Sequence, residues 1–513
     1  MYSPEEKYRE AEKAIAKVDK KAEALKQSIL NAESVYPTDG KVYYVSPLGN
    51  DANDGLSPEK AWKTVKRVSD ADELRPGDAV LFERDRMFRG AEIAPPAATV
   101  TSVVCREGVT YSAYGEGAKP VINCSPEDGT GAANWEKVEG TEHIWRYKNK
   151  LMDVGMIYFD GGVRCGVKQI PDCIGGKYYV RDTNGEKEYD FKTELKENFD
   201  FFSECNKVLY ENGVPNCYVP QNKGDLYLYC DMGNPGEVFG SIEFAVKKHG
   251  LRIGGSGVTV DNLCILYAGA HGIAAGTTEN LTVRNCEIGW IGGVIQCYQP
   301  SGRVVRFGNG IEIYGGCKHY TVEHNYIYQC YDAGATHQFS AVGKNDVIME
   351  DTVYKDNLFE YCIYSIEYFL GKAESEDTTR YMRHTVIKDN LSRFAGFGFG
   401  EQRPDKGSAA HIKSWDHYNR SDDFIIENNI FDRSRHMTIH ISAFDAAWLP
   451  ALKNNTYIQH RDFTGTLGRF GTAPTENIPY TDDVGEYLAA NGIEKGAKVF
   501  FAPNDALCDI PNK

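Results

Sequence analysis

The chain has 513 residues, of which 42% are hydrophobic and 12% aromatic, so it can bury a large core, and we expect one big domain with an insertion. Lys and Arg total 57 against 73 Asp and Glu, which gives a formal charge of -16. This balance argues against nucleic acid or an anionic membrane as the main partner, because both attract basic surfaces. No apolar run could span a bilayer, and the charged N-terminal segment lacks the features of a secretory signal, so we expect a cytoplasmic protein.

The 14 cysteines are scattered without a CxxC pair. Several lie inside apolar strand patterns, among them Cys264, Cys286, Cys330 and Cys362. Thiols in such positions are typical of a reduced core, so we predict neither a disulfide framework nor a zinc site.

The first part of the chain divides into a helix and a run of strands. Residues 1–35 are rich in Ala, Glu and Lys and predict a helix. Residues 36–131 begin with "KVYYVSPLGNDANDG", which predicts a strand and a turn, and continue with a short helix at about 58–68 and a strand at about 79–82. Residues 132–248 contain "HIWRYKN", "GMIYFDGG", "KYYVRD" and "DLYLYCD", which predict an inserted antiparallel β unit.

A repeat organises residues 249–513, the main coils and the C-terminal tail. A short apolar strand followed by Asn recurs seven times, at Asn262, Asn285, Asn325, Asn357, Asn390, Asn429 and Asn455. Alternation and β-branched residues dominate each unit, and units that each expose an apolar face must stack to bury it. We therefore predict an all-β, right-handed parallel β-helix in which Asn takes the left-handed corner conformation and its amide bonds to the same residue one coil on. The N-terminal helix is expected to cover the open end of this solenoid.

A second strand follows each asparagine, in the segments "HGIAAG", "NGIEIYG", "AGATHQF", "YSIEYFLG", "FGFGEQRP" and "MTIHISAF". Side chains alternate along a strand, so inward isoleucines place Glu312, Glu367 and His440 on the outer face of one sheet. In 333–339 either Thr336 and Gln338 or His337 faces outward. In 397–403 inward phenylalanines would turn Glu401 inward, whereas a bulge at the glycines would present Glu401, Gln402 and Arg403 together.

These acids suggest glycoside hydrolysis, which needs one protonated and one ionised carboxyl group. Strands of neighbouring coils lie about 4.8 Å apart. Acids one coil apart can therefore approach the roughly 5 Å of a retaining enzyme, and acids two coils apart lie near about 9.5 Å, the upper end of the inverting range. We expect Glu367 and Glu401 in adjacent coils and Glu312 and Glu367 two coils apart, and we name Glu312, Glu367 and Glu401 as candidate catalytic residues. The alternative for any one of them is a solvated surface charge.

Flat aromatic rings and multidentate donors suit sugar recognition. The candidate substrate-binding residues are Asp332, His337, Gln338, Tyr368, Gln402, Arg403, His411, Trp415, His440, Trp290 and Tyr298. Asp332 also fits a plain turn residue, and His337 and His440 fit structural roles. His436 and His440 would have a zinc spacing on a helix, but their segment predicts a strand, so no metal site is expected there.

The opening "KVYYVSPLGNDANDGLSPEKAWKTVKRV" and the coils from about 250 to 460 resemble the bacterial right-handed β-helix carbohydrate-active proteins of the pectate-lyase-like superfamily. With the inserted β unit, the chain is similar to the β-xylosidase-like glycoside hydrolases of this fold. Those enzymes carry an Asp in a "WLDW"-like strand and a Glu in a "VEVNHG"-like strand one coil later. The comparable strands here are "GIEIYG" and "GATHQF", so the second acid is missing at that place, and Glu367 lies one coil further.

Three functions remain open. The leading one is a cofactor-free glycoside hydrolase acting on an oligosaccharide or polysaccharide. The resemblance also implies a polysaccharide lyase or epimerase acting on uronic acids, with a base among Arg403, Lys413, Lys372 and His411. A lyase of this fold uses calcium or another positive group, and "NDVIMED", with Asp346, Glu350 and Asp351, would be the place for calcium. The third is a non-catalytic saccharide-binding solenoid.

Overall fold

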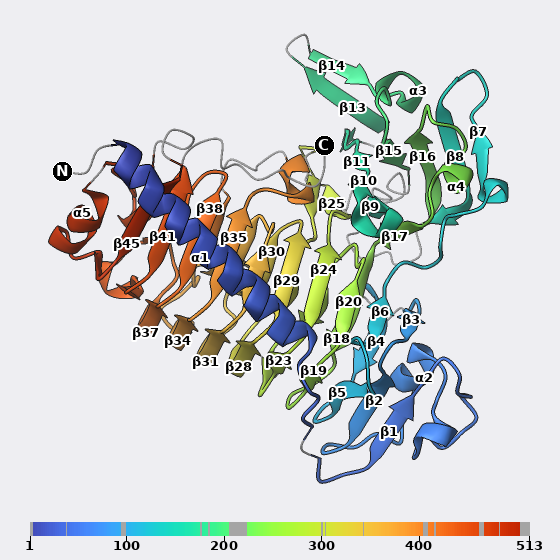
Figure 1. Cartoon of the computed structure of the whole chain (residues 1–513), viewed down its shortest axis with the longest axis horizontal. Coiled ribbons are helices and arrows are strands. Elements are labelled where there is room, and N and C mark those ends of the chain that lie inside the picture. The colour runs from blue at the N-terminus through green and yellow to red at the C-terminus, as the bar shows by residue number, and fades with distance from the viewer. Residues whose placement is uncertain are drawn as a thin grey trace.

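The computed structural model describes most of the chain, namely residues 4–36, 38–93, 99–174, 177–182, 185–204, 223–298, 301–302, 304–341, 343–403, 409–414, 417–460, 466–481 and 483–502. Within these residues the chain winds repeatedly through three long sheets, visiting the first, second and third sheet in turn on each coil (Figure 1). The predicted parallel β-helix is confirmed, since successive coils pair in parallel register.

Each sheet takes one strand from nearly every coil. The first sheet contains β1 (Val42–Val45), β2 (Ala79–Glu83), β5 (Thr110–Tyr114), β19 (Thr259–Asp261), β22 (Thr278–Glu279), β23 (Thr282–Arg284), β28 (Cys317–Glu323), β31 (Val347–Lys355), β34 (Arg380–Lys388), β37 (Ser421–Glu427), β40 (Ala451–Lys453) and β44 (Glu494–Lys495). The second contains β3 (Met87–Arg89), β6 (Val121–Asn123), β20 (Cys264–Leu266), β24 (Glu287–Ile291), β29 (Tyr326–Cys330), β32 (Leu358–Glu360), β35 (Leu391–Ala395), β38 (Ile430–Ser434), β41 (Thr456–His460) and β45 (Lys498–Ala502). The third contains β4 (Val100–Cys105), β18 (Lys248–Ile253), β21 (Ile273–Ala275), β27 (Ile311–Tyr314), β30 (Ala333–Phe339), β33 (Tyr364–Leu370), β36 (Ala410–Ser414), β39 (Ile439–Ala443), β42 (Gly468–Thr472) and β43 (Asn477–Ile478).

The hollow of the solenoid is filled by apolar side chains that alternate with outward residues. Ile311, Ile366, Ile412 and Ile439 from four coils of the third sheet are buried in one core cluster. The cysteines singled out in the sequence, Cys264, Cys286, Cys330 and Cys362, are buried thiols that form no disulfide.

Buried asparagines join successive coils at the corner between the first and second sheets. Asn325 donates its side-chain amide to Oδ1 of Asn357 at 3.0 Å, and the bond repeats from Asn357 to Asn390 at 2.9 Å and on to Asn429 and Asn455. The predicted amide ladder is therefore present. The predicted left-handed conformation holds for Asn262 and Asn285, but in the later coils the residue before the ladder asparagine adopts it, as His324, Asp356, Asp389, Asn428 and Asn454 do.

The inserted unit is built from strands that pair mainly antiparallel, as predicted. One sheet has the order β11-β15-β16-β8-β7, a second β10-β9-β17 and a third β12-β13-β14. The strand bounds are β7 Trp135–Lys137, β8 Ile144–Leu151, β9 Val154–Phe159, β10 Arg164–Cys165, β11 Val167–Lys168, β12 Asp172–Ile174, β13 Lys177–Asp182, β14 Gly185–Glu188, β15 Asp200–Ser203, β16 Gly224–Tyr229 and β17 Ile242–Val246. The short helices α3 (Phe191–Glu194) and α4 (Pro235–Val238) belong to the same unit.

The N-terminal helix α1 (Pro4–Leu30) does not cover an open end of the solenoid, so that expectation is wrong. It runs lengthwise along the second sheet (Figure 1). Val18, Ala22 and Ile29 pack there against Leu358, Leu391 and other apolar residues of the sheet. An apolar stripe on the outside of this sheet offers the helix more burial than a single terminal coil would.

The remaining helices are short. The helix expected at about 58–68 is a 3-10 turn (Pro58–Lys60) followed by α2 (Val65–Ser69), and α5 (Val484–Ala490) lies near the C-terminus. Among the helices in the described ranges, none combines the length and the apolar character needed to cross a bilayer.

Candidate active site in a cleft on the third sheet

One side chain from each coil falls in line on the outer face of the third sheet. Strand register places Arg252 beside Ala274, Ala274 beside Glu312, Glu312 beside Thr336, and Thr336 beside Glu367. The line continues with Lys413, His440 and Arg469. We call this row the outer column. Glu312 and Glu367 thus share one face and lie two coils apart, as the alternation of residues predicted.

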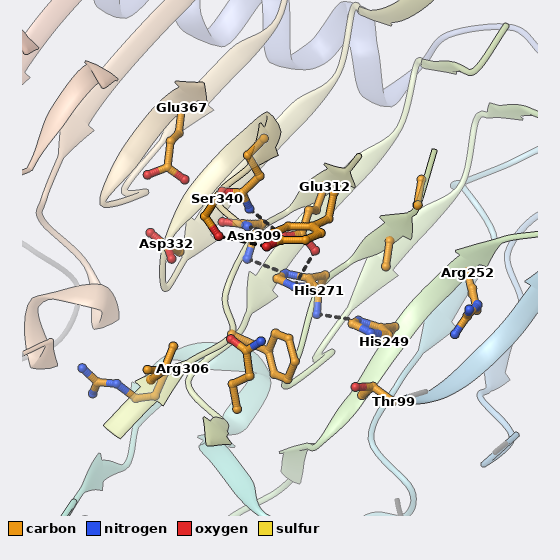
Figure 2. Close-up of a pocket in the computed structure, with 18 of the residues that line it drawn as sticks. Thr99, His249, Arg252, His271, Arg306, Asn309, Glu312, Asp332, Ser340 and Glu367 are labelled. Carbon is orange, nitrogen blue, oxygen red and sulfur yellow. Dashed lines mark hydrogen bonds and ion pairs between the residues drawn. The ribbon is translucent and has the colours of Figure 1, made fainter. Parts of the chain in front are cut away.

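A cleft of about 980 Å³ is lined by the outer-column residues Arg252, Ala274, Glu312 and Glu367. The antiparallel hairpin of β25 (Ile295–Tyr298) and β26 (Val304–Arg306) forms one wall. Asp332, at the corner before β30, also lines the cleft, and Figure 2 shows Asp332 and Glu367 on one side with Glu312 opposite. Three carboxyl groups therefore surround one space.

Glu312 is held as a carboxylate. Its side chain is only 12% exposed, and His271 Nε2 lies 2.7 Å from Oε2. Gln338 Nε2 donates to Oε1 at 2.6 Å, and Asn309 Nδ2 contributes a longer bond of 3.4 Å. Burial by itself would raise the pKa of Glu312, but His271, Gln338 and Asn309 outweigh burial and leave this pKa below its ordinary value of 4.5.

The donor role of His271 follows from its other ring nitrogen. His271 Nδ1 accepts a hydrogen bond from the backbone N–H of Asn309 at 3.0 Å. A nitrogen that accepts carries no proton, so in the neutral ring the proton is on Nε2, which donates to Glu312. His271 therefore orients the Glu312 carboxylate by donating from Nε2.

Glu367 has the opposite environment. It is 2% exposed, and its Oε1 has no hydrogen-bond partner among the described residues. Burial raises the pKa of Glu367 well above its ordinary value, the negative charge of Asp332 raises it further, and Arg403 and Lys413 offset only part of this effect. These surroundings favour the neutral acid form of Glu367.

Asp332 connects the two sides of the site. It forms an ion pair with Arg403 at 2.5 Å, and the Arg403 guanidinium also lies over the rings of Tyr331 and Tyr364. Asp332 is thus more than a turn residue, because its charge acts on Glu367 and its position is fixed by a cation.

Glu401 does not join the other acids. The expectation that it stacks one coil after Glu367 is wrong, because Lys413 occupies that register. Residues Phe399–Gln402 form a 3-10 turn after Gly398, whose φ is 86°, and Glu401 there forms an ion pair with Arg435. Gln402 also faces elsewhere: its amide donates to the Gly166 carbonyl and accepts from the Lys168 backbone N–H, which fastens the inserted unit to the solenoid.

Three predicted substrate-binding residues point into the core. His337 bonds to the Tyr354 hydroxyl at 2.8 Å and stacks on Tyr368, and both His337 and Tyr368 are buried. His411 is buried against the ring of Phe431. Burial lowers the pKa of His337 and of His411 to about 3, so both rings are neutral. Thr336 and Gln338 are the outward pair in 333–339, and contact of His337, Tyr368 or His411 with a ligand in the cleft is excluded by their direction.

The aromatic residues predicted to bind substrate instead pack within the protein where the structure describes them. Tyr298 is buried against Cys173 and Phe202 of the inserted unit, and Trp290 packs on Tyr158 and Phe399. Trp415 lies outside the described residues. His440 is in the outer column beyond Glu367, where its Nδ1 lies 2.6 Å from Lys413 Nζ, and burial together with Lys413 lowers its pKa to about 3.

The acids considered for calcium lie on the first sheet. Asp346 caps the backbone N–H of Thr379. Glu350 and Asp351, with His384, offer ligand atoms within 4.8 Å of one another. Calcium prefers oxygen ligands, however, and Glu350 already pairs with Arg383 while Asp351 pairs with His384. This group fits calcium poorly and is not part of the cleft.

Three cleft residues were not predicted from the sequence. They form a second row near the N-terminal ends of strands in the third sheet. His249, His271 and Asn309 each precede a glycine and an inward aliphatic residue, in "HGLRI", "HGIAA" and "NGIEI". The rings of His249 and His271 stack with centroids 5.1 Å apart. The recurrence of a polar residue before Gly was a signal that could have located them.

No family model matches the chain. A lacto-N-biosidase of Bifidobacterium longum subsp. longum is 35% identical over 117 residues, which cover 22% of this chain and only 7% of that protein. Among solved structures, XylC in complex with xylose aligns over 92% of this chain and 85% of its own, with 14% identity and a TM-score of 0.39. A GH136 lacto-N-biosidase from Eubacterium ramulus aligns over 90% and 68%, with 13% identity and a TM-score of 0.35. The pectate lyase Pel9A aligns over 85% and 72%, with 12% identity and a TM-score of 0.36.

Proposed function

We propose that the chain is a glycoside hydrolase in which Glu367 is the general acid and Glu312 the general base. The observation that supports this most strongly is the contrast between two carboxyl groups facing one cleft, since hydrogen bonds and His271 lower the pKa of Glu312, whereas burial raises the pKa of Glu367. Pairs of acids whose environments drive their pKa values apart are typical of glycosidases.

The reaction that fits the spacing is a single displacement. Glu367 donates its proton to the glycosidic oxygen as the bond from that oxygen to the anomeric carbon breaks. Glu312 removes a proton from the water molecule whose oxygen bonds to the anomeric carbon. Two coils correspond to about 9.5 Å between the backbones, which leaves room for this water and belongs to the inverting range. Thr336 occupies the intermediate coil, where a retaining enzyme would place its nucleophile.

The similarity to a lacto-N-biosidase adds support for a glycan substrate, although the matched segment is a small part of that relative. The assigned route needs no cofactor. A screen with aryl glycosides of common sugars tests the hydrolase assignment, with release of the phenol as the signal. For an aryl glycoside with a poor leaving group, such as a methylphenyl glycoside, hydrolysis by the wild type is expected to be lost in Glu312→Gln and in Glu367→Gln, and hydrolysis that survives both substitutions would refute the assignment.

A polysaccharide lyase is the second candidate. Lys413, His440 and Arg469 form a basic continuation of the outer column next to Glu367, and a lyase needs a base and a cation near a uronate. A lyase creates an unsaturated uronate, so ultraviolet absorbance rises as the polymer is cut. A hydrolase releases reducing ends without that absorbance, and a binding protein gives neither signal.

A further inference from the structure

Arg252 stands at the end of the cleft opposite Glu367. It belongs to β18 and is in register with Val104 on one side and Ala274 on the other, two coils from Glu312. It lines the cleft together with Thr99 and His249, and Figure 2 shows it far from Asp332 and Glu367. The acids lie toward one end of the cleft, where Arg306 also lines it, and the Arg252 guanidinium lies at the other end.

This guanidinium has no ion pair or hydrogen bond with the described part of the chain. Other arginines on the solenoid surface are paired, as Arg284 is with Asp261 at 3.1 Å and Arg383 is with Glu350. The neighbours of Arg252 in the outer column, Val104 and Ala274, are apolar. In a chain of formal charge -16, an arginine that has no acid partner among the described residues of a cleft has its donors available for a ligand.

His249 adds another donor group beside Arg252. Its Nδ1 accepts the backbone N–H of His271 at 3.1 Å, so in the neutral ring Nε2 carries the proton. Burial lowers the pKa of His249 well below its usual value, and His271 and Arg252 lower it further, which keeps the ring neutral and this tautomer in place. Figure 2 shows the His249 ring between His271 and Arg252.

We propose that Arg252 and His249 form a subsite for an anionic group on the glycan substrate. The planar fork of an arginine matches two oxygens of one anion, and His249 Nε2–H supplies a third donor. A hydroxyl group would satisfy this set less well, because a fork of charged donors is best matched by a group that only accepts. The anion is the carboxylate of a uronic acid or a sulfate ester. This inference rests on the proposed function for the glycan that carries the anion.

The test measures binding and turnover with matched ligands. Short oligouronides are compared with the same oligosaccharides after reduction of their carboxyl groups to alcohols, and with O-sulfated neutral oligosaccharides of equal length. Calorimetry on the full chain carrying Glu367→Gln gives Kd without turnover, and wild-type kinetics give kcat/KM. Arg252→Gln is then added to both, with Arg383→Gln as the control, because Arg383 lies on the first sheet and pairs with Glu350 away from the cleft.

Arg252→Gln is expected to weaken binding of the acidic oligosaccharide about 10- to 150-fold and to leave the carboxyl-reduced ligand unaffected. Arg383→Gln should change neither. Whether the uronate or the sulfate ester binds identifies the source of the anion. Equal wild-type affinity for acidic and reduced ligands, or an equal loss for both in Arg252→Gln, would overturn the subsite.

The two proposals fail in different ways. If neutral glycosides are cleaved and no acidic ligand binds, the anionic subsite is wrong and the hydrolase assignment stands. If acidic ligands bind through Arg252 and no glycosidic bond is cleaved in any of them, the subsite stands and the hydrolase assignment fails.

Discussion

Replacing Glu367 by Gln tests whether the side chain acts as a proton donor, because Gln keeps nearly the same volume but cannot act as the acid. The side chain is buried, and its Oε1 has no partner in the described residues, so an amide of nearly the same volume fits the site. In the proposed mechanism, the variant loses the proton that Glu367 gives to the leaving oxygen. General acid catalysis contributes about 100- to 10,000-fold, so kcat/KM for an unactivated glycoside should fall by that factor, equivalent to about 3 to 5 kcal/mol.

The assay compares leaving groups. A dinitrophenyl glycoside needs almost no protonation as it departs, so Glu367→Gln should cleave it at close to the wild-type rate while losing activity on a methylphenyl glycoside. Glu427→Gln, the same substitution on the outer face of the first sheet, is the control and should behave as wild type. An equal loss on both glycosides would refute the acid role, and unchanged activity on both would remove Glu367 from the mechanism.

The same variant should gain stability. The folded protein raises the pKa of Glu367, so the stability that the neutral acid allows is fully present below its unfolded pKa and is lost as the pH rises through the folded pKa. Glu367→Gln removes that loss. Its midpoint of thermal unfolding should therefore match the wild type at low pH and exceed it at neutral pH, and a lower midpoint at neutral pH would contradict the burial argument.

Three further predictions concern the neighbours of Glu367 and the scaffold. Asp332→Asn removes the charge that raises the pKa of Glu367, so the alkaline limb of the kcat/KM profile should move to lower pH; an unmoved limb would show that Asp332 does not act on the acid. Because the pKa of Glu312 is lowered, wild-type activity should persist below pH 4.5, and an acid limb above that value would contradict the contacts of Glu312. Asn357→Ala breaks four buried hydrogen bonds of the amide ladder, so urea unfolding should show a loss of about 4 kcal/mol, and a loss under about 1 kcal/mol would argue against a structural ladder.

The architecture was predictable because the coils repeat a local rule. Alternation around Ile311 and Ile366 determines which side chains face outward, and the pairing of coils then aligns Glu312 with Glu367. The amide ladder followed from the recurrence of asparagine. The left-handed corner conformation was predicted one residue too late in the later coils, where the residue before the ladder asparagine adopts it, as Asp356 does before Asn357.

The wrong predictions have a common physical cause, because the positions of these residues depend on contacts with residues that are distant in the sequence. His337 bonds through Nδ1 to the Tyr354 hydroxyl inside the core, so a polar residue in this strand did not have to face solvent. Glu401 lies in a 3-10 turn that Gln402 attaches to the inserted unit by a hydrogen bond, and no local sequence pattern predicts that bond. The helix α1 found its apolar partner on the second sheet, although its composition specified only that it is helical.

The environment of the acids was also beyond the sequence pattern. Neither the donors around Glu312 nor the burial of Glu367 can be seen from strand alternation, since His271 and Gln338 come from other coils. The assignment of one acid and one base therefore depends on the folded structure.

The most direct test of the account is the configuration of the first sugar that the wild-type protein releases. Proton NMR recorded during turnover distinguishes the two anomers before they equilibrate. With Glu312 and Glu367 two coils apart, the released hemiacetal should have the configuration opposite to that of the substrate, with no vinyl proton in the spectrum. A product of retained configuration would contradict the proposed pair, and a vinyl signal would show that the bond is broken by elimination rather than by water.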